Sequence, residues 1–353
     1  MYKDLLQKLA KGEDLNKEEY LLLIGNRESL RTDAAEAACR VRNEHYGRRV
    51  FIRGLVEFTN YCRNNCNYCG IRAANSELSR YRLTGSEITE CCDIGYGLGF
   101  RTFVLQGGED MYYTDDILAE IVRQIKKSHP DCAVTLSVGE RSRESYRILR
   151  EAGADRYLLR HETVNRDHYK SLHPDTMSYD NRMRCLYDLK ELGYQVGCGF
   201  MVGSPGQTED DLADELLFIR GFKPEMVGIG PFIPHHDTPY SEEKAGSAEL
   251  TLFLLSLIRL TLPDVLLPAT TALGTADPLG REKGIEAGAN VLMPNLSPSG
   301  VRKKYMLYDN KICTGDEAAA CISCLKMRIS RTGCEIVTNR GDHNKNGGII
   351  NEI

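Results

Sequence analysis

Short runs of β-branched and aliphatic residues alternate with longer segments of helical period from residue 50 onward. The runs are VFIRGLVEF, RTFVLQ, CAVTLSV, RYLLR, YQVGCGFMVG, MVGIGPF, VLLPATT and ANVLMP. In the intervening segment TDDILAEIVRQIKK, Ile117, Ile121 and Ile125 recur every four residues beside Leu118 and Val122, which predicts an amphipathic helix. Eight such alternations without a series of hairpins favour parallel β/α units.

The pattern predicts an α/β fold, a (β/α)8 TIM-type barrel with an N-terminal helical extension, with a doubly wound sheet as the alternative. We expect residues 1–48 to form helices that pack on the barrel and residues 49–310 to form the barrel itself. Residues 311–353 are expected to be a C-terminal segment whose last 20 residues form a polar, mobile tail. In either fold, ligands gather at the carboxyl ends of the strands.

Two polar patterns predict where helices begin, and one apolar stretch raises the question of a membrane. Thr84-x-x-Glu87 has the form of a capping box, and Thr208 precedes acidic residues, so both are helix starts. The stretch LTLFLLSLIRLTLP is interrupted by Ser256 and Arg259 and is too short to cross a bilayer, so it predicts a buried helix.

Charge and the N-terminus narrow the choice of compartment and partner. The first 20 residues are charged throughout and contain no apolar core typical of a secretion signal, so we expect a cytoplasmic protein without a membrane segment. The net charge is -5 and no dense block of Lys or Arg occurs, which argues against nucleic acid as the partner. The expected partner is a small molecule or another protein.

Cysteines carry the strongest chemical signal. The chain has 13 of them, and in a reducing compartment metal binding explains such a number better than disulfides do. In EFTNYCRNNCNYCGIR, Cys62, Cys66 and Cys69 have the spacing C-x3-C-x2-C. A structural zinc site needs four ligands, whereas an iron-sulfur cube held by three thiolates keeps one iron open for a small molecule.

Other polar residues follow the later runs. After the second run come Gln106, Gly107, Gly108 and Glu109. Glycines let the backbone approach a ligand, although Gly-Gly-Glu is also an ordinary turn. Thr135 and Ser137 alternate with apolar neighbours on the third run. The fourth ends with Arg160 and Glu162, and Arg182 opens the next helix; these could clamp a carboxylate or bind ribose hydroxyls, or simply be solvated.

The cysteine spacing, with Tyr68 before the last cysteine and Gly70 after it, resembles the signature of the radical S-adenosylmethionine (SAM) superfamily. The resemblance implies a 4Fe-4S cluster on Cys62, Cys66 and Cys69. Its open iron would be chelated by SAM, and an electron from the cluster would release a 5'-deoxyadenosyl radical. The stretch from Gln106 to Glu109 is similar to the family's GGE motif, which holds the methionine amino group.

Within that superfamily, nearly the whole chain resembles the maturases that help to assemble the active site of FeFe hydrogenase. The stretches that carry the resemblance are EFTNYCRNNCNYCGIR, VLQGGED, DRYLLRHET, MVGSPGQT, MVGIGPFIPHHDTP, PATTALGT and ANVLMPN. It implies that Ser137, Glu162 and Arg182 bind SAM, with Thr135 and Arg160 beside them. A departure is Gly107, where some relatives carry serine.

The same resemblance implies an auxiliary 2Fe-2S or 4Fe-4S cluster on Cys313, Cys321 and Cys324 that the radical chemistry does not need. It also implies a cavity inside the barrel, with Arg53, Met226, Thr270, Thr271 and Met293 as candidate contacts. The implied substrate is an iron carbonyl-cyanide complex carrying cysteine, made by a partner radical enzyme, and the product passes to other hydrogenase maturation proteins.

Three alternatives remain. A carbon-skeleton mutase such as methylornithine synthase shares the barrel, but the auxiliary cysteines and PFIPHHDTP favour the maturase. Biotin synthase is disfavoured because Cys132 and Cys198 alone do not form its second cluster site inside the barrel. A carrier that only delivers iron-sulfur clusters would not explain the polar strand ends.

Overall fold

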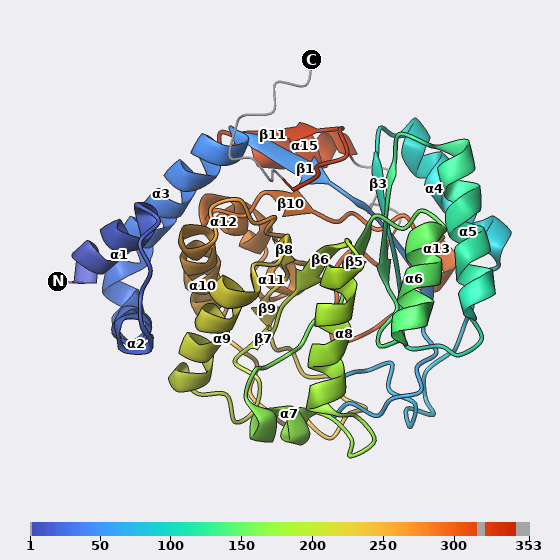
Figure 1. The fold of residues 1–353 in the computed structure, drawn as a ribbon, viewed down its shortest axis with the longest axis horizontal. Helices are drawn as coiled ribbons and strands as arrows, with labels where there is room; N and C mark the ends of the chain where they lie inside the picture. Colours follow the sequence, from blue (N-terminus) through green and yellow to red (C-terminus); the bar gives the residue numbers. More distant parts are fainter. Residues whose placement is uncertain (1, 316–321, 344–353) are drawn as a thin grey trace.

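The structure is a computed structural model that describes residues 2–315 and 322–343 (Figure 1). Its centre is a parallel sheet whose strands pair in sequence order along the chain. These strands are β2 (Gly54–Thr59), β3 (Thr102–Gly107), β4 (Ala133–Ser137), β5 (Arg156–Leu158), β6 (Gln195–Cys198) and β8 (Met226–Val227). Each contains one of the apolar runs read from the sequence, because strands covered by helices on the outer face are buried on both faces.

Isolated bridges close this sheet into a barrel. Met226 pairs with Leu266, Pro268 pairs with Val291, and Leu55 pairs with Asn295, all in the parallel sense. The segment from Leu266 to Pro268 and the chain around β10 (Val291–Leu292) therefore complete a ring that returns to β2. The predicted TIM-type barrel is confirmed, and a doubly wound sheet, which has open edges, is excluded.

Helices cover the outer face of the ring. They are α4 (Gly85–Gly97), α5 (Asp115–Ser128), α6 (Arg143–Glu151), α7 (Arg166–Leu172), α8 (Tyr179–Glu191), α9 (Glu209–Phe222), α10 (Ala248–Thr261), α11 (Thr271–Ala276), α12 (Gly280–Glu286) and α13 (Ser299–Arg302). The capping box predicted at Thr84 is present, and the helix start predicted at Thr208 is confirmed and also has a capping box, with Asp211. In α5, Ile121 and Ile125 are buried as predicted, whereas Ile117 lies at the edge of the apolar stripe and is 37% exposed.

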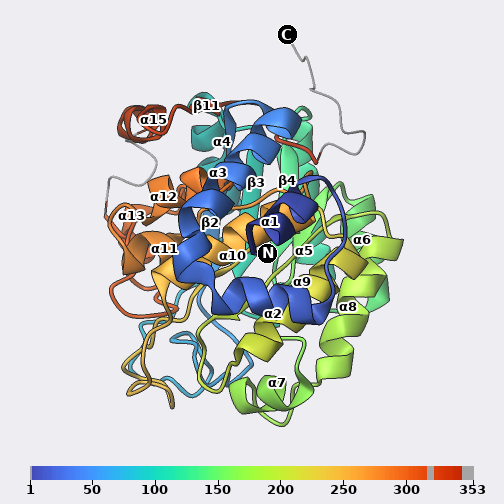
Figure 2. The ribbon, with the colours of Figure 1, turned by 90° about the vertical axis from the view of Figure 1, so that its left-hand side faces the viewer.

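The N-terminal helices α1 (Tyr2–Ala10), α2 (Lys17–Gly25) and α3 (Arg27–Tyr46) pack on one side of the barrel (Figure 2). Helix α3 lies against α10, and α2 lies against α9. Helix α10 is the apolar stretch predicted to be buried, and its Leu254 and Leu257 are fully enclosed. Among the described residues, no helix is both long and apolar enough to cross a membrane.

The amino ends of the strands are closed by the C-terminal segment. Strand β1 (Arg49–Ile52) pairs with β10 and with β11 (Glu335–Val337), which follows α15 (Ile322–Ser330). Beyond β11, Asp342 Oδ1 lies 2.6 Å from Arg156 Nη2, and Thr102 Oγ1 donates to the Arg340 carbonyl. The first part of the predicted tail, up to residue 343, thus has polar contacts with β3 and β5, and residues 344–353 lie outside the described part.

Candidate active site

The three cysteines of the C-x3-C-x2-C sequence lie together on the loop between β2 and α4, at the carboxyl end of the barrel. Their side chains line a cavity of about 290 Å³. The cavity is also lined by Tyr68, Gln106, Gly107, Gly108, Glu109, Ser137, Arg160, Glu162, Met177, Arg182, Tyr305 and Tyr308. The structure thus brings most of the predicted site residues to one place.

The thiols are buried and close enough to influence one another. Burial, followed by the neighbouring Cys62, raises the pKa of Cys66 to about 12. Burial, followed by Cys66 and Cys62, also raises the pKa of Cys69 well above its usual value. Without a metal the three groups are therefore thiols, and bound iron would supply the positive charge that stabilises them as thiolates. A cluster of thiols facing one cavity fits an iron-sulfur group held by three ligands.

Close packing fixes the loop that carries the cysteines. A Cβ atom on Gly70 would lie 2.3 Å from both His235 Cδ2 and the Met306 carbonyl oxygen, so no larger residue fits there. A Cβ on Gly108 would lie 2.2 Å from the Tyr61 carbonyl oxygen. The glycine after the third cysteine and the second glycine of the Gln106–Glu109 stretch are therefore required by contacts with the loop and its neighbours.

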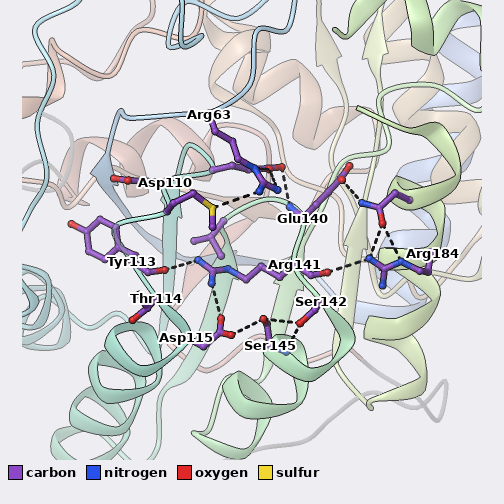
Figure 3. Close-up of a pocket in the computed structure, with 14 residues that line it drawn as sticks. Arg63, Asp110, Tyr113, Thr114, Asp115, Glu140, Arg141, Ser142, Ser145 and Arg184 are labelled. Atoms are coloured by element: carbon purple, nitrogen blue, oxygen red, sulfur yellow. Dashed lines mark hydrogen bonds and ion pairs between the residues drawn. The ribbon is translucent and has the colours of Figure 1, made fainter. Parts of the chain in front are cut away.

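Glu109 forms a wall of the cavity. Its Oε2 accepts from Arg63 Nε at 3.0 Å, and its Oε1 accepts from the backbone N–H of Glu140 at 2.9 Å. Arg63 and Glu140 also line a separate outer pocket of about 510 Å³, in which Arg141 is held by Asp115 and the Tyr113 carbonyl (Figure 3). Glu109 lines both spaces, so its carboxylate stands between the cysteine cavity and the outer pocket.

Arg182 is a buried cation held by a carboxylate that the sequence analysis missed. Its Nε donates to Glu140 Oε1 at 2.6 Å, and its Nη1 donates to the Arg160 carbonyl at 2.7 Å. Burial lowers the pKa of Arg182, but Tyr169 and the carboxylates Glu140 and Glu109 outweigh this and raise it well above its usual value. Arg182 therefore stays charged and can receive an anionic group.

Several polar atoms around the cavity are buried without a hydrogen-bond partner among the described residues. In residues that line the cavity, they are Arg160 Nε and Nη2 and Glu162 Oε2. Thr135 Oγ1 and Tyr169 Oη, in residues that do not line it, are likewise without a partner. Arg160 Nη2 and Glu162 Oε2 lie 2.9 Å apart as an ion pair, but without hydrogen-bond geometry. Unpaired buried polar groups are uncommon and costly. Cationic donors and anionic acceptors together suit a ligand with amino, carboxylate and hydroxyl groups. The residues present fit SAM.

Glu162 has a left-handed backbone (φ 67°). The residue before it takes part in a buried His–Glu pair that the sequence analysis also missed. His161 Nε2 lies 2.6 Å from Glu215 Oε2, and both side chains are fully buried. Glu215 Oε1 accepts from the Val164 N–H at 2.7 Å, and Gly199 N–H donates to His161 Nδ1. Helix α9 therefore fixes the chain on both sides of Glu162.

A second, inner cavity of about 190 Å³ lies inside the barrel and shares Gln106, Ser137 and Arg160 with the cysteine cavity. It is lined by four of the predicted contacts, Met226, Thr270, Thr271 and Met293, together with Glu57, Cys198, Tyr308 and Lys311.

Of the residues predicted to contact SAM or the substrate, two line neither cavity. Arg53 stands just before β2, at the amino end of the barrel, where its Nη1 lies 2.8 Å from Met226 Sδ and its Nη2 faces the Gly341 carbonyl. Its prediction as a cavity contact is wrong because Met226 and the C-terminal segment cover it. Thr135 lies two residues before Ser137 in β4, is fully buried, and does not reach the cavity surface.

The second cysteine group is only partly described. Cys313 has a left-handed backbone (φ 64°), and its Sγ lies 3.2 Å from Arg281 Nη2. Cys324 lies on α15. Cys321 lies outside the described residues. The auxiliary cluster therefore remains a prediction.

Comparison with known proteins agrees with this site. Residues 56–219, which contain all three cysteines of the loop, match the model of the Radical SAM superfamily. The [FeFe] hydrogenase maturase subunit HydE of Thermotoga maritima is 48% identical over 331 residues, which cover 94% of each chain. The chain belongs to the HydE family. It is a radical SAM enzyme of that family, as the cysteine spacing indicated.

The chain is also similar, at lower sequence identity, to proteins named for a different function. The 3-methylornithine synthase of Methanosarcina barkeri is 32% identical over 281 residues, or 78% of each chain. The crystal structure of methylornithine synthase (PylB) superposes with a TM-score of 0.81 at 27% identity, covering 94% of this chain and 97% of that one. The two proteins therefore share the barrel, and the fold alone does not determine the reaction.

Proposed function

We propose that this HydE family member is a hydrogenase maturase whose radical acts on a cysteine-bound iron carbonyl-cyanide complex in the inner cavity. When bound, the 4Fe-4S cluster and SAM supply a 5'-deoxyadenosyl radical. The observation that carries the proposal is that Gln106, Ser137 and Arg160 line both cavities. A molecule in the inner cavity lies next to the SAM site and inside the closed barrel, where reactive intermediates are protected from water.

The chain's own residues have separate roles in this proposal. Cys62, Cys66 and Cys69 hold the cluster, and Glu109 accepts from the SAM amino group. Arg182 faces the carboxylate of SAM, and Glu162 accepts from its ribose. Ser137 and Arg160, which line both cavities, lie where the radical and the substrate meet.

The inner cavity suits a compact anionic metal complex. Met226 and Met293 offer polarizable sulfur, and Thr270 and Thr271 offer hydroxyl donors. We further propose that Cys313, Cys321 and Cys324 bind the auxiliary cluster and that other maturation proteins deliver the substrate and receive the product. The cytoplasm is the proposed compartment, because cluster ligation needs reduced thiols.

The test is anaerobic reconstitution with iron and sulfide, followed by reduction and addition of SAM. Formation of 5'-deoxyadenosine is then measured with the cysteine-bound iron dicarbonyl cyanide complex, with lysine, and with neither. Stimulation by the iron complex is expected. Stimulation by lysine alone would instead identify a mutase like methylornithine synthase, and an intact cluster without SAM cleavage would identify a cluster carrier.

A further inference from the structure

A buried ion pair in the wall of the inner cavity has no role in the chemistry described so far. Lys311 Nζ lies 2.6 Å from Glu57 Oε1 and 2.8 Å from the Tyr305 carbonyl oxygen. The Lys311 side chain is 5% exposed and that of Glu57 is 1% exposed. Both residues line the cavity.

The position of Glu57 is fixed independently of the lysine. Its Oε2 accepts from Asn295 Nδ2 at 2.8 Å, and Asn295 Oδ1 in turn accepts from the Ser297 N–H. Burial raises the pKa of Glu57, while Lys311 and Asn295 act in the opposite direction. The carboxylate is therefore a rigid acceptor at the middle of β2, and it holds the ammonium group in one place.

The ammonium group has hydrogen-bonding capacity left over. A protonated lysine carries three donors, and among the described residues Nζ has two acceptors, Glu57 and the Tyr305 carbonyl. Nζ also lies over the Tyr305 ring, 4.8 Å from its centroid. A ring face is a weaker partner than an anionic acceptor, and Lys311 lines the inner cavity, so its third N–H is available to a molecule there. Removing an ammonium group from water is costly unless it is fully paired, so an anionic ligand would complete this site.

A second cation of the cavity stands nearer to the cysteines. Arg160 lines both cavities, and its Nε and Nη2 have no hydrogen-bond partner within the described part of the chain. Arg160 is paired with Glu162, as Lys311 is paired with Glu57, so each cation can offer donors to a ligand while its own charge stays balanced. The cavity between them is small, at about 190 Å³, and suits a compact anion.

We infer that Lys311 is a substrate-binding residue, held by Glu57, that donates a hydrogen bond to an anionic acceptor of the substrate in the inner cavity. The inference deepens the proposed function and rests on it for the identity of the substrate. A carboxylate or a metal-bound cyanide has the required charge and acceptor atom. Lys311 would thereby set which end of the molecule points toward the SAM site.

The first measurement tests the anion site alone. Azide is added to the reconstituted enzyme with SAM bound to the oxidised cluster, and the infrared band of bound azide is titrated. We expect the dissociation constant to rise about 10- to 100-fold in Lys311→Met, the effect of losing a charge-assisted hydrogen bond, and to change little in Lys311→Arg. Equal binding by the wild-type enzyme and Lys311→Met would overturn the inference.

Two further variants separate the loss of the anion site from a general loss of stability. Lys311→Met leaves the Glu57 carboxylate buried without its cation, so the double variant Glu57→Gln/Lys311→Met removes both charges and should lose azide binding while keeping the thermal midpoint. Glu57→Gln alone keeps the ammonium group and removes its competitor, so azide binding should become tighter. Weaker azide binding in Glu57→Gln, with the fold intact, would contradict the proposed role.

The second measurement repeats the titration with the cysteine-bound iron dicarbonyl cyanide complex. Weaker binding of the complex in Lys311→Met, with a changed cyanide band, supports the inference. If the wild-type enzyme binds azide through Lys311 but does not bind the complex, the proposed substrate is wrong while the anion site stands. If the complex binds equally well to both proteins, Lys311 is not a substrate-binding residue.

Discussion

The Cγ atom of Glu109 lies 2.0 Å from the position that a Cβ atom on Gly139 would occupy. Gly139 follows β4 with a left-handed backbone (φ 77°), and the next residue, Glu140, donates its N–H to Glu109. The absence of a side chain at position 139 therefore makes room for the Glu109 side chain, and the same turn supplies a donor that orients its carboxylate.

Gly139→Ala should move Glu109 and weaken SAM binding by about 10- to 100-fold, the expected effect of losing hydrogen bonds to a charged ligand. The measurement is equilibrium binding of SAM to the reconstituted enzyme. Gly193 is the matched control: its φ is also 77°, but a Cβ there meets nothing within 4 Å. Gly193→Ala should cost about 1 kcal/mol of stability and leave SAM affinity unchanged.

The two cysteine groups should separate in function. Cys66→Ala removes a thiol from the cavity wall, so the variant should lose the cluster absorbance and all SAM cleavage. Cys313→Ala should lower the iron content of the reconstituted protein and keep SAM cleavage close to the wild-type rate. Loss of cleavage in Cys313→Ala with an intact first cluster would mean that the second group serves the radical chemistry after all.

The barrel could be predicted because its strands are short, apolar and separated by helices with the correct period. The strands and helices could each be predicted from neighbouring residues alone. In helix α5, for example, the spacing of Ile121 and Ile125 identifies the buried face. The cysteine loop could be predicted for a similar reason, since Cys62, Cys66 and Cys69 lie within eight positions of one another.

The missed residues depend on contacts between distant parts of the chain. Lys311 and Glu57 are 254 positions apart, and nothing near Lys311 in the sequence distinguishes it from a surface lysine. The available signal was Glu57 itself, a charged residue within the apolar run VFIRGLVEF. Arg53 was misplaced because the sequence does not show that the chain around Gly341 returns to the amino end of the barrel.

Glu215 should act as a positioning residue for Glu162. In Glu215→Gln, one amide oxygen has to replace two carboxylate oxygens, so either His161 Nε2–H or the Val164 N–H loses its acceptor. The variant should lose about 1–3 kcal/mol of stability and bind SAM several-fold more weakly. Glu209→Gln on the same helix removes an exposed ion pair with Arg27 and should change neither quantity. Unaltered SAM affinity in folded Glu215→Gln would show that Glu162 holds its conformation unaided.

His173 should make the stability of the metal-free protein depend on pH. Burial, followed by Arg182, lowers its pKa from 6.5 to about 3, and its Nδ1–H donates to the Tyr169 carbonyl while Nε2 accepts from Tyr68. Below pH 6.5 the unfolded chain binds a proton at this site that the folded protein does not bind until about pH 3, so stability falls as the pH falls between these values.

The loss from His173 should reach roughly 1–2 kcal/mol at pH 5, because each unit of pKa difference corresponds to about 1.4 kcal/mol. The check is denaturant unfolding between pH 7.5 and 5, comparing the wild-type protein with His173→Gln. The variant is less stable at neutral pH, since it cannot reproduce both hydrogen bonds, but its stability should fall less steeply on acidification. Parallel curves for the two proteins would mean that His173 takes up a proton as readily in the folded protein as in the unfolded chain.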